Sequence, residues 1–236
     1  MSSLVSYELN DAVATITMDD GKVNALSPAM QAEINAALDQ AAAGAAAGEV
    51  KAVVLAGSSK VFSGGFDLSV FSSGDVAATL GMLAGGFELA VRTLSFPVPV
   101  IMAATGHAIA MGSFLLLSGD HRVGSSTARC QANEVKIGMT LPIAAIEIMR
   151  MRLTPATFQR ALSMAAVFTG DAAIAGGWVD EVVEADAVLA RAQEVAAEAA
   201  ATLNTGAHVA SKLKARAGAL TAIQAGIDGL AKEFAG

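Results

Sequence analysis

The stretch Phe62-Ser63-Gly64-Gly65-Phe66-Asp67-Leu68 decides the fold of this chain. It follows an apolar strand candidate at residues 52–56 and precedes a segment with helical periodicity. A second glycine-bearing turn, residues 105–112, follows a strand candidate at 100–104 in the same way. When two strands end in small-residue turns that lead into helices, their backbone N–H groups can point at one spot. The two turns therefore predict an oxyanion hole.

The rest of the pattern is typical of an α/β protein with a parallel sheet. Segments 4–9 and 13–18, joined by Asn10-Asp11, predict a β-hairpin. A further short strand is expected at 121–123, and strands alternate with helices at 27–47, 75–94 and 112–118. In helix 75–94 the pair Gly85-Gly86 is a weak point. Beyond residue 134 we expect helices at 142–153, 154–167, 171–177, 187–203 and 208–234, an extended segment at 178–183, and Thr221 as a candidate break in the last helix.

Composition limits the function classes. With 236 residues, 54% of them hydrophobic and 5% aromatic, the chain fits one large α/β domain or a domain with a small appendage. A net charge of −7 argues against nucleic acid and anionic membrane as partners. No secretory pattern follows Met1, and no apolar run reaches the about 20 residues of a membrane span, so we expect a cytoplasmic protein. The single cysteine, Cys130, excludes an intramolecular disulfide and is expected to be a buried apolar filler.

Four motifs in register resemble the crotonase superfamily, the enoyl-CoA hydratase/isomerase family. They occur in the family's order and spacing and cover roughly residues 5–185. They are Asn24-Ala25-Leu26-Ser27; residues 62–68; Thr105-Gly106-His107-Ala108 through Gly112 and into Gly119-Asp120-His121-Arg122; and Thr169-Gly170-Asp171-Ala172-Ala173 with Gly176-Gly177-Trp178-Val179-Asp180-Glu181-Val182-Val183.

The resemblance implies a fold, an assembly and a substrate class. The fold is a spiral of ββα units over residues 1–185, followed by a helical trimerisation region at 186–236, and the assembly is a homotrimer or a dimer of trimers. The substrate is an acyl-CoA thioester, so coenzyme A arrives with the substrate and neither a separate cofactor nor a metal is expected. In the family two backbone N–H groups hold the thioester oxygen, and these correspond here to Phe66 and Met111. Ala25, Gly65, Gly112 and Phe114 are expected to line the same substrate site.

The acid–base residue separates the reactions of the family. Its hydratases use two glutamates, which correspond here to Phe114 and to Glu134, twenty residues later. One carboxylate can move a proton from C2 to C4 of a 3-enoyl thioester, whereas hydration suits two. The pair Asn133-Glu134, followed by Ile137-Gly138, also resembles the isomerase branch. We therefore expect Δ3,Δ2-enoyl-CoA isomerisation by Glu134, with a pKa raised by an apolar pocket that includes Phe114 and Met111.

Three other functions stay open from the sequence. The first is hydration of 2-enoyl-CoA with one glutamate, at a lower rate. The second is a non-catalytic oligomer that binds acyl-CoA and has lost its second acid. Other reactions of the superfamily, such as thioester hydrolysis or decarboxylation, form the third group.

Basic residues must meet the phosphates of coenzyme A on an otherwise acidic chain. Lys22 and Lys60 are the first candidates, and Lys212, Lys214 and Arg216 form a cluster that could reach the nucleotide, although all five suit a solvated surface equally.

Other polar residues of the motifs suit structural roles. We expect Asp67 to cap a helix, Asp120 and Arg122 to form an ion pair or cap, and His107 to be a core or trimer-facing residue. His121 and His208 have no metal-ligand spacing, and the Walker and GxGxxG patterns are absent from the sequence.

Overall fold

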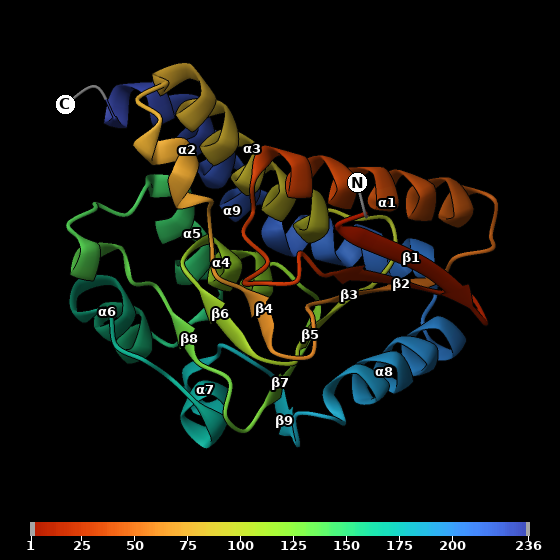
Figure 1. Cartoon of the computed structure of the whole chain (residues 1–236). Coiled ribbons are helices and arrows are strands. Elements are labelled where there is room, and N and C mark those ends of the chain that lie inside the picture. The colour runs from red at the N-terminus through yellow and green to blue at the C-terminus, as the bar shows by residue number, and fades with distance from the viewer. Residues whose placement is uncertain (1–2, 235–236) are drawn as a thin grey trace.

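A computed structural model describes residues 3–234 of the chain (Figure 1). The strands are β1 (Val5–Asn10), β2 (Val13–Met18), β3 (Ala52–Ala56), β4 (Val61–Ser63), β5 (Val100–Ala104), β6 (His107–Ile109), β7 (His121–Ser125), β8 (Cys130–Gln131) and β9 (Glu181–Val183). The helices are α1 (Pro28–Ala46), α2 (Leu68–Ser72), α3 (Val76–Leu94), α4 (Met111–Leu117), the 3₁₀ helix η1 (Glu134–Ile137), α5 (Ile143–Arg152), α6 (Pro155–Met164), α7 (Gly170–Gly176), α8 (Val188–Thr202) and α9 (Thr205–Glu233).

A six-stranded sheet forms the centre of the molecule, in the order β1-β2-β3-β5-β7-β9. The hairpin pair β1–β2 is antiparallel, and the pairs from β2–β3 to β7–β9 are parallel. The alternation of strands and helices thus predicts this sheet correctly, because a parallel pair requires a crossover connection.

A smaller parallel sheet, in the order β4-β6-β8, carries the two glycine turns. Each repeating unit of the chain contributes one strand to the large sheet and one short strand to the small sheet, and one or two helices follow. The sets are β3-β4-α2-α3, β5-β6-α4 and β7-β8-η1-α5, which confirms the expected spiral of ββα units. These short strands correct the prediction from sequence, in which each glycine motif passed directly from a strand through a turn to a helix. Strands of only two or three residues are too short to show a periodicity in the sequence.

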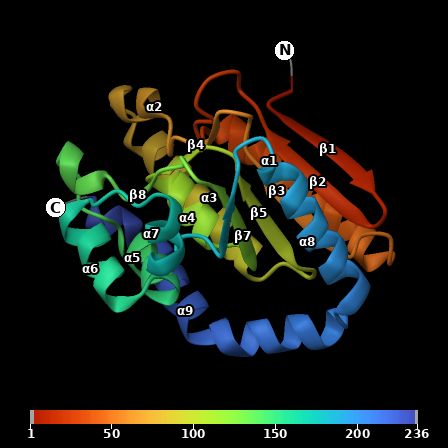
Figure 2. The ribbon, with the colours of Figure 1, turned by 90° about the horizontal axis from the view of Figure 1, so that it is seen from below.

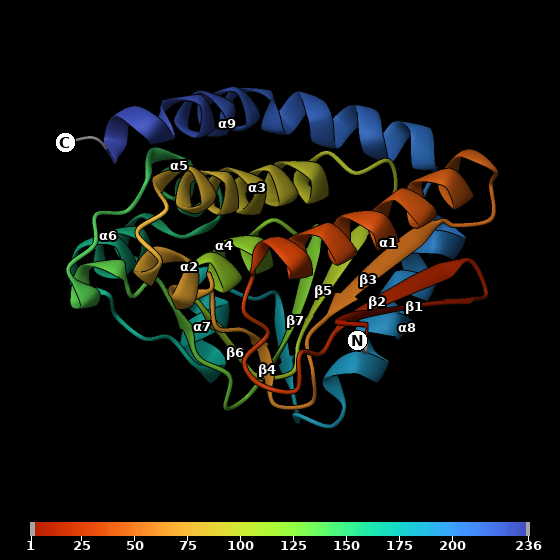
Figure 3. The same cartoon turned by 45° about the horizontal axis from the view of Figure 1, so that its top comes forward.

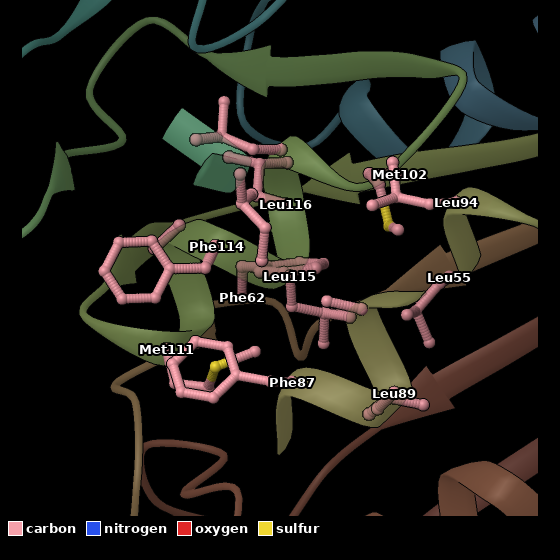
Figure 4. Packing of buried hydrophobic residues seen from close by; sticks show 14 of the residues in the cluster. Leu55, Phe62, Phe87, Leu89, Leu94, Met102, Met111, Phe114, Leu115 and Leu116 are labelled. Carbon is pink, nitrogen blue, oxygen red and sulfur yellow. The ribbon is translucent and has the colours of Figure 1, made fainter. Parts of the chain in front are cut away.

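Both faces of the large sheet are covered. On one face, Ala52, Val54 and Ala56 of β3 pack with Val188 and Ala192 of α8. Figure 2 shows α8 beside β2 and β3. On the other face, alternate residues of β3 and β5 join the main core with α1, α3 and α4. Figure 4 shows Leu55 and Met102 of these strands beside residues of α3 and α4. This arrangement explains why residues 52–56 form an uninterrupted apolar run.

The C-terminal helices pack on the core. Helix α9 lies along α3 and α5 (Figure 3), and α8 contacts β3, β5 and β7. The predicted break at Thr221 is wrong, since α9 is continuous and the Thr221 hydroxyl donates to the Ala217 carbonyl at 3.0 Å. The predicted weak point at Gly85-Gly86 is also wrong, since α3 continues through both residues. The domain boundary after residue 185 and the role of 186–236 in trimerisation stay predictions.

Three observations concern the expectations from composition. Cys130 is buried, and desolvation raises the pKa of its thiol to about 12, so the sulfur is a protonated apolar filler. Between residues 3 and 234, the helices are too short or too polar to cross a bilayer. The same residues contain no cluster of three histidine, cysteine or acidic side chains placed to hold a metal ion.

Candidate active site

The first glycine turn follows β4 and is held by its own backbone. The Gly65 carbonyl accepts a hydrogen bond from Leu26 N–H at 2.8 Å, and Gly64 N–H donates to the Val23 carbonyl at 2.8 Å. Gly65 N–H donates to the Ser63 hydroxyl at 3.2 Å. These bonds use the backbone polar groups that precede Phe66, and because the Gly65 carbonyl and the Phe66 N–H group belong to one peptide, they fix that peptide.

The two turns meet at Gly65. Its φ is +98°, and a Cβ built there would lie 2.9 Å from Ala110 Cβ and 3.0 Å from the Ile109 carbonyl oxygen. The same point is 3.4 Å from the backbone nitrogen of Met111. Only glycine fits this approach, because any side chain would push the second turn away and would also be strained at that φ.

The second turn is strained at Ala110, the residue that precedes α4. Its φ of 50° and ψ of −127° are unusual for a residue with a side chain. This conformation is held because Ala110 N–H donates to the Gln131 carbonyl at 2.9 Å. The first turn of α4 leaves Met111 N–H outside the helix ladder. Within residues 3–234, neither Phe66 N–H nor Met111 N–H donates a hydrogen bond.

A cavity of about 350 Å³ opens beside these groups. Its lining is mainly apolar, with polar groups from Asp67, Asn133 and Glu134. The lining residues are Val23, Ala25, Gly64, Phe66, Asp67, Leu68, Phe71, Ala110, Asn133, Glu134, Ile137 and Met139. The structure thus brings Glu134, Phe66 and Ala25 together, although the sequence separates the first from the others by more than sixty residues.

Glu134 is positioned at the start of η1, which Gly138 terminates in the left-handed conformation, with a φ of 79°. Met139 N–H donates to the Glu134 carbonyl at 2.9 Å, so the backbone around the carboxylate is closed into a tight turn. The residue is 7% exposed, and its Oε2 has no hydrogen-bond partner among the residues that the structure describes. Desolvation is the largest influence and raises the pKa of Glu134 to about 7.

Two of the residues expected to make the pocket apolar lie outside it. Phe114 is buried, and its ring stacks on Phe87 at 6.3 Å between centroids (Figure 4). The Met111 side chain belongs to the same apolar cluster. The cavity is instead made apolar by residues such as Leu68, Phe71 and Ile137. The expectation that Phe114 and Met111 form its wall is therefore wrong, while the direction of the Glu134 pKa is as expected.

Other predicted residues stand behind the cavity or away from it. Gly112 packs closely on Ser63, so its role is to let α4 approach the first turn. Lys22 and Lys60 are exposed and do not line the cavity, although Lys22 is next to Val23, which does. Asp67 is the N-cap of α2, as expected, and accepts from Ser69 N–H at 2.9 Å.

The basic cluster of the last helix is not available to a nucleotide as a group. Lys212 is buried and donates to Asp120 at 2.8 Å, and Arg216 binds the other oxygen of the same carboxylate at 2.8 Å. Only Lys214 of the three is exposed. The prediction that the cluster reaches the nucleotide is therefore corrected, because two of its three charges are used to hold α9 on the core.

The predicted pair Asp120–Arg122 is also corrected. Arg122 is 4% exposed and binds Asp180 through two guanidinium nitrogens, Nε at 2.9 Å and NH2 at 2.7 Å. His107 is not a core histidine, since it is exposed and its Nδ1 accepts from Arg129 N–H at 3.2 Å. That His107 faces another subunit stays a prediction.

Asn24 and Ser63 belong to the quoted motifs, but no individual role was predicted for either residue. The Asn24 side chain is fully buried and donates to the carbonyls of Met18, Val61 and Phe62, at 3.0 to 3.3 Å. The Ser63 hydroxyl donates to the Asn24 carbonyl at 2.8 Å and accepts from Gly65 N–H. Together they tie the loop before α1 to the first glycine turn. Asn24 follows polar residues such as Asp20 and Lys22, so its burial could not be predicted from the local sequence, although a buried amide must find hydrogen-bond partners.

Comparison with known proteins places these features in a family. The family model described as enoyl-CoA hydratase/isomerase matches residues 8–231. A "probable enoyl-CoA hydratase" of Rhodobacter capsulatus is 34% identical over 141 residues, which are 57% of this chain and 51% of that protein. The present chain thus aligns with about half the length of that relative. "Probable enoyl-CoA hydratase EchA14" of Mycobacterium tuberculosis is 31% identical over 84% of this chain and 75% of its own.

Solved structures agree over the whole chain. The crystal structure of probable enoyl-CoA hydratase EchA3 from Mycobacterium tuberculosis H37Rv has a TM-score of 0.94 and 55% identity, and the match covers 98% of this chain and 96% of that chain. An apo structure described as an M. tuberculosis enoyl-CoA isomerase has a TM-score of 0.93 and 55% identity, covering 99% and 100%. The architecture is the crotonase fold, and the chain belongs to the enoyl-CoA hydratase/isomerase family.

Proposed function

We propose that this chain isomerises 3-enoyl-CoA to 2-enoyl-CoA, with Glu134 as the group that carries the proton. One observation carries the proposal. Glu134 presents a carboxylate oxygen in the cavity that has no hydrogen-bond partner among residues 3–234, whereas the position of the family's other glutamate is Phe114, buried against Phe87.

The proton balance of isomerisation needs one carboxylate. Glu134, as carboxylate, removes a proton from C2 of the thioester, and the electron pair delocalises into a dienolate. The protonated Glu134 then returns the same proton at C4, and the double bond lies between C2 and C3. No water or second acid is consumed.

The dienolate oxygen requires hydrogen-bond donors that are already in place. Phe66 N–H and Met111 N–H fit this role, because both are free within residues 3–234 and their turns meet at Gly65. Removal of one such donor typically costs about 2.7–4 kcal/mol of transition-state stabilisation. Because the donors belong to the backbone, the side chains of residues 66 and 111 are free to pack elsewhere.

A pKa of about 7 suits a group that must act both as base and as acid near neutral pH. A carboxylate at its usual pKa would be a weak base toward a carbon acid, and its conjugate acid would be scarce. Burial of Glu134 in the apolar cavity provides the shift without a partner charge, since desolvation is the largest contribution.

The proposal includes the substrate and the assembly. Acyl-CoA thioesters are the substrates that the family assignment supports, with the acyl group in the cavity and Lys22 and Lys60 as candidates for phosphate contact. A homotrimer or dimer of trimers is the expected assembly, and sedimentation velocity of the purified chain measures it directly.

Hydration of 2-enoyl-CoA is the second candidate. The relatives described as hydratases favour it, and so does one structural observation: Asp67 is a second carboxylate that lines the cavity. In that reaction Glu134 and Asp67 would share the handling of water and the proton.

A panel of 2- and 3-enoyl-CoA substrates, run with wild type, Glu134→Gln and Asp67→Asn, tests both candidates. We expect conversion of 3-enoyl-CoA that Glu134→Gln abolishes and Asp67→Asn retains. Formation of 3-hydroxyacyl-CoA from crotonyl-CoA, lost in both variants, would replace isomerisation by hydration. Acyl-CoA binding without turnover in wild type would favour the non-catalytic binder. Glu198→Gln, an exposed carboxylate on α8, is the matched control.

A further inference from the structure

Gly86, in the middle of α3, lies where the side chains of the two candidate oxyanion donors converge. A Cβ built on Gly86 would be 2.5 Å from Cε1 and 2.7 Å from Cζ of Phe66, and 3.4 Å from Cγ of Met111. These two side chains come from the two glycine turns, which follow the neighbouring strands β4 and β6 of the small sheet, and they meet at a helix residue that has no side chain.

The Phe66 ring is enclosed on this side by aromatic neighbours. It makes edge contacts with Phe71 of α2, at 6.4 Å between centroids, and with Phe87 of α3, at 6.1 Å. Phe87 in turn stacks on Phe114. Phe66 is partly exposed and also lines the cavity. The ring therefore lies between the surface of α3 and the cavity, with Phe71 and Phe87 on its flanks.

A methyl group at position 86 could not be accommodated by a small adjustment. Ordinary carbon–carbon contacts lie at about 3.5–4.0 Å, so the ring would have to move by about 1 Å or more. The helix backbone is continuous through Gly86, and the Phe66 backbone is fixed by the hydrogen bonds of Gly65 to Leu26 and Ser63. The ring can thus only turn about its own side-chain bonds, and its unobstructed side is the cavity.

We propose that Gly86 is a specificity-determining position: its missing side chain lets the Phe66 ring rest on α3 and so keeps the cavity open for the acyl chain. Phe66 then has two separate roles, with its N–H group serving the oxyanion hole and its ring forming a movable wall. This inference rests on the proposed acyl-CoA substrate, and it concerns which acyl chains fit and not which reaction follows.

The test uses Gly86→Ala with Gly81→Ala as its matched control. Both glycines are in α3, and a Cβ at Gly81 meets nothing within 4 Å, so the control has the same gain in helix propensity without the contact. Binding of butanoyl-CoA and decanoyl-CoA is measured by calorimetry, which requires no turnover. A crystal structure of ligand-free Gly86→Ala locates the ring.

We expect Gly86→Ala to bind butanoyl-CoA within about twofold of wild type and decanoyl-CoA at least about tenfold more weakly, since each excluded methylene group costs roughly fourfold in affinity. Gly81→Ala should match wild type for both ligands. The double variant Gly86→Ala/Phe66→Ala keeps the backbone N–H of residue 66 and removes the ring, so decanoyl-CoA binding should return.

The proposal is overturned if the ring of Gly86→Ala stays where it is in wild type, or if both ligands lose affinity equally. It is also overturned if the double variant binds decanoyl-CoA as poorly as Gly86→Ala. If Gly86→Ala does not fold, Phe66→Ala is compared with the double variant. Equal free energies of unfolding and equal affinities for butanoyl-CoA and decanoyl-CoA support the proposed contact between position 86 and the Phe66 ring, and a difference contradicts it. Absence of turnover in wild type would refute the proposed reaction alone, because the ring position is measured without ligand.

Discussion

Lys212 Nζ lies 2.8 Å from Asp120 Oδ2, and this ion pair joins α9 to the central sheet. Asp120 follows α4, and its carboxylate also accepts from Val100 N–H at the start of β5, at 2.8 Å. Its other oxygen binds Arg216, one helical turn after Lys212, at 2.8 Å. The three side chains are at most 12% exposed, so one carboxylate neutralises two cations away from water.

Replacing Asp120 by Asn should destabilise the protein by about 3–5 kcal/mol, because it leaves buried cations without a counter-charge. Urea unfolding at neutral pH measures the loss. Asp39→Asn is the control: Asp39 pairs with Arg92 on the surface, where its side chain is 74% exposed, and such a pair contributes about 0–1 kcal/mol. Equal losses in the two variants would show that the Asp120 cluster does not hold α9 in place.

The pH dependence of the reaction should follow Glu134. Its pKa is raised to about 7 by burial, and the reaction begins with the deprotonated form. Therefore kcat/KM for a 3-enoyl-CoA should rise with pH and reach half of its plateau near pH 7, since kcat/KM reports ionisations of the free enzyme. Stopped-flow or steady-state rates between pH 5 and pH 9 give the profile. A flat profile across this range would exclude Glu134 as the base.

The raised pKa of Glu134 also predicts how the free energy of unfolding depends on pH. The sign of this dependence is opposite to that of most carboxylates, whose pKa is lowered by folding. The folded-state pKa of Glu134 is raised from 4.5 to about 7, so the folded protein holds the proton more tightly than the unfolded chain. The stabilisation is complete below pH 4.5 and is lost as the pH rises through 7. At 1.36 kcal/mol per pKa unit, the raised pKa contributes about 3 kcal/mol to the free energy of unfolding when Glu134 is fully protonated.

The side chain of the Glu134→Gln variant cannot ionise, so this variant should not lose stability as the pH rises through 7. Relative to wild type, the variant should therefore gain up to about 3 kcal/mol of unfolding free energy between pH 5 and pH 8. Urea unfolding of both proteins at the two pH values measures the change, and Glu198→Gln, on the exposed face of α8, should show none. A constant difference between Glu134→Gln and wild type would contradict the raised pKa.

The large sheet was predictable because its strands are fully buried. Residues 52–56 and 100–104 face helices on both sides, so their sequences are uninterrupted apolar runs that stand out from the surroundings. Helix starts were predictable where a cap exists, as at Ser27, whose hydroxyl accepts from Met30 N–H at 3.2 Å. Only local chemistry is needed in both cases.

The errors concern features that depend on distant neighbours. Gly85-Gly86 suggests a weak helix, but each glycine is there because a side chain from elsewhere, Gln31 or Phe66, occupies the space of a Cβ. Lys212 and Arg216 resemble solvated surface charges until α9 is placed against Asp120. The cavity wall was misassigned for the same reason: spacing places Phe114 near Glu134 in register, and only packing shows that its ring faces Phe87.

Gly65→Ala should remove most of the activity while the chain still folds. A Cβ at Gly65 would lie 2.9 Å from Ala110 Cβ, and φ at Gly65 is +98°, so the turn must shift away from Met111. Displacing even one oxyanion donor costs about 2.7–4 kcal/mol, or roughly 10²–10³-fold in kcat.

Gly48→Ala is the matched control, since Gly48 has a φ of +78° and nothing within 4 Å of a Cβ. It carries the backbone cost of about 1–2 kcal/mol for a residue with a side chain in the left-handed conformation, without the crowding. Turnover of a 3-enoyl-CoA by both variants, together with their urea unfolding, separates the two effects. If Gly65→Ala lost no more activity than Gly48→Ala, the approach of the two turns at Gly65 would not be what positions Phe66 N–H and Met111 N–H.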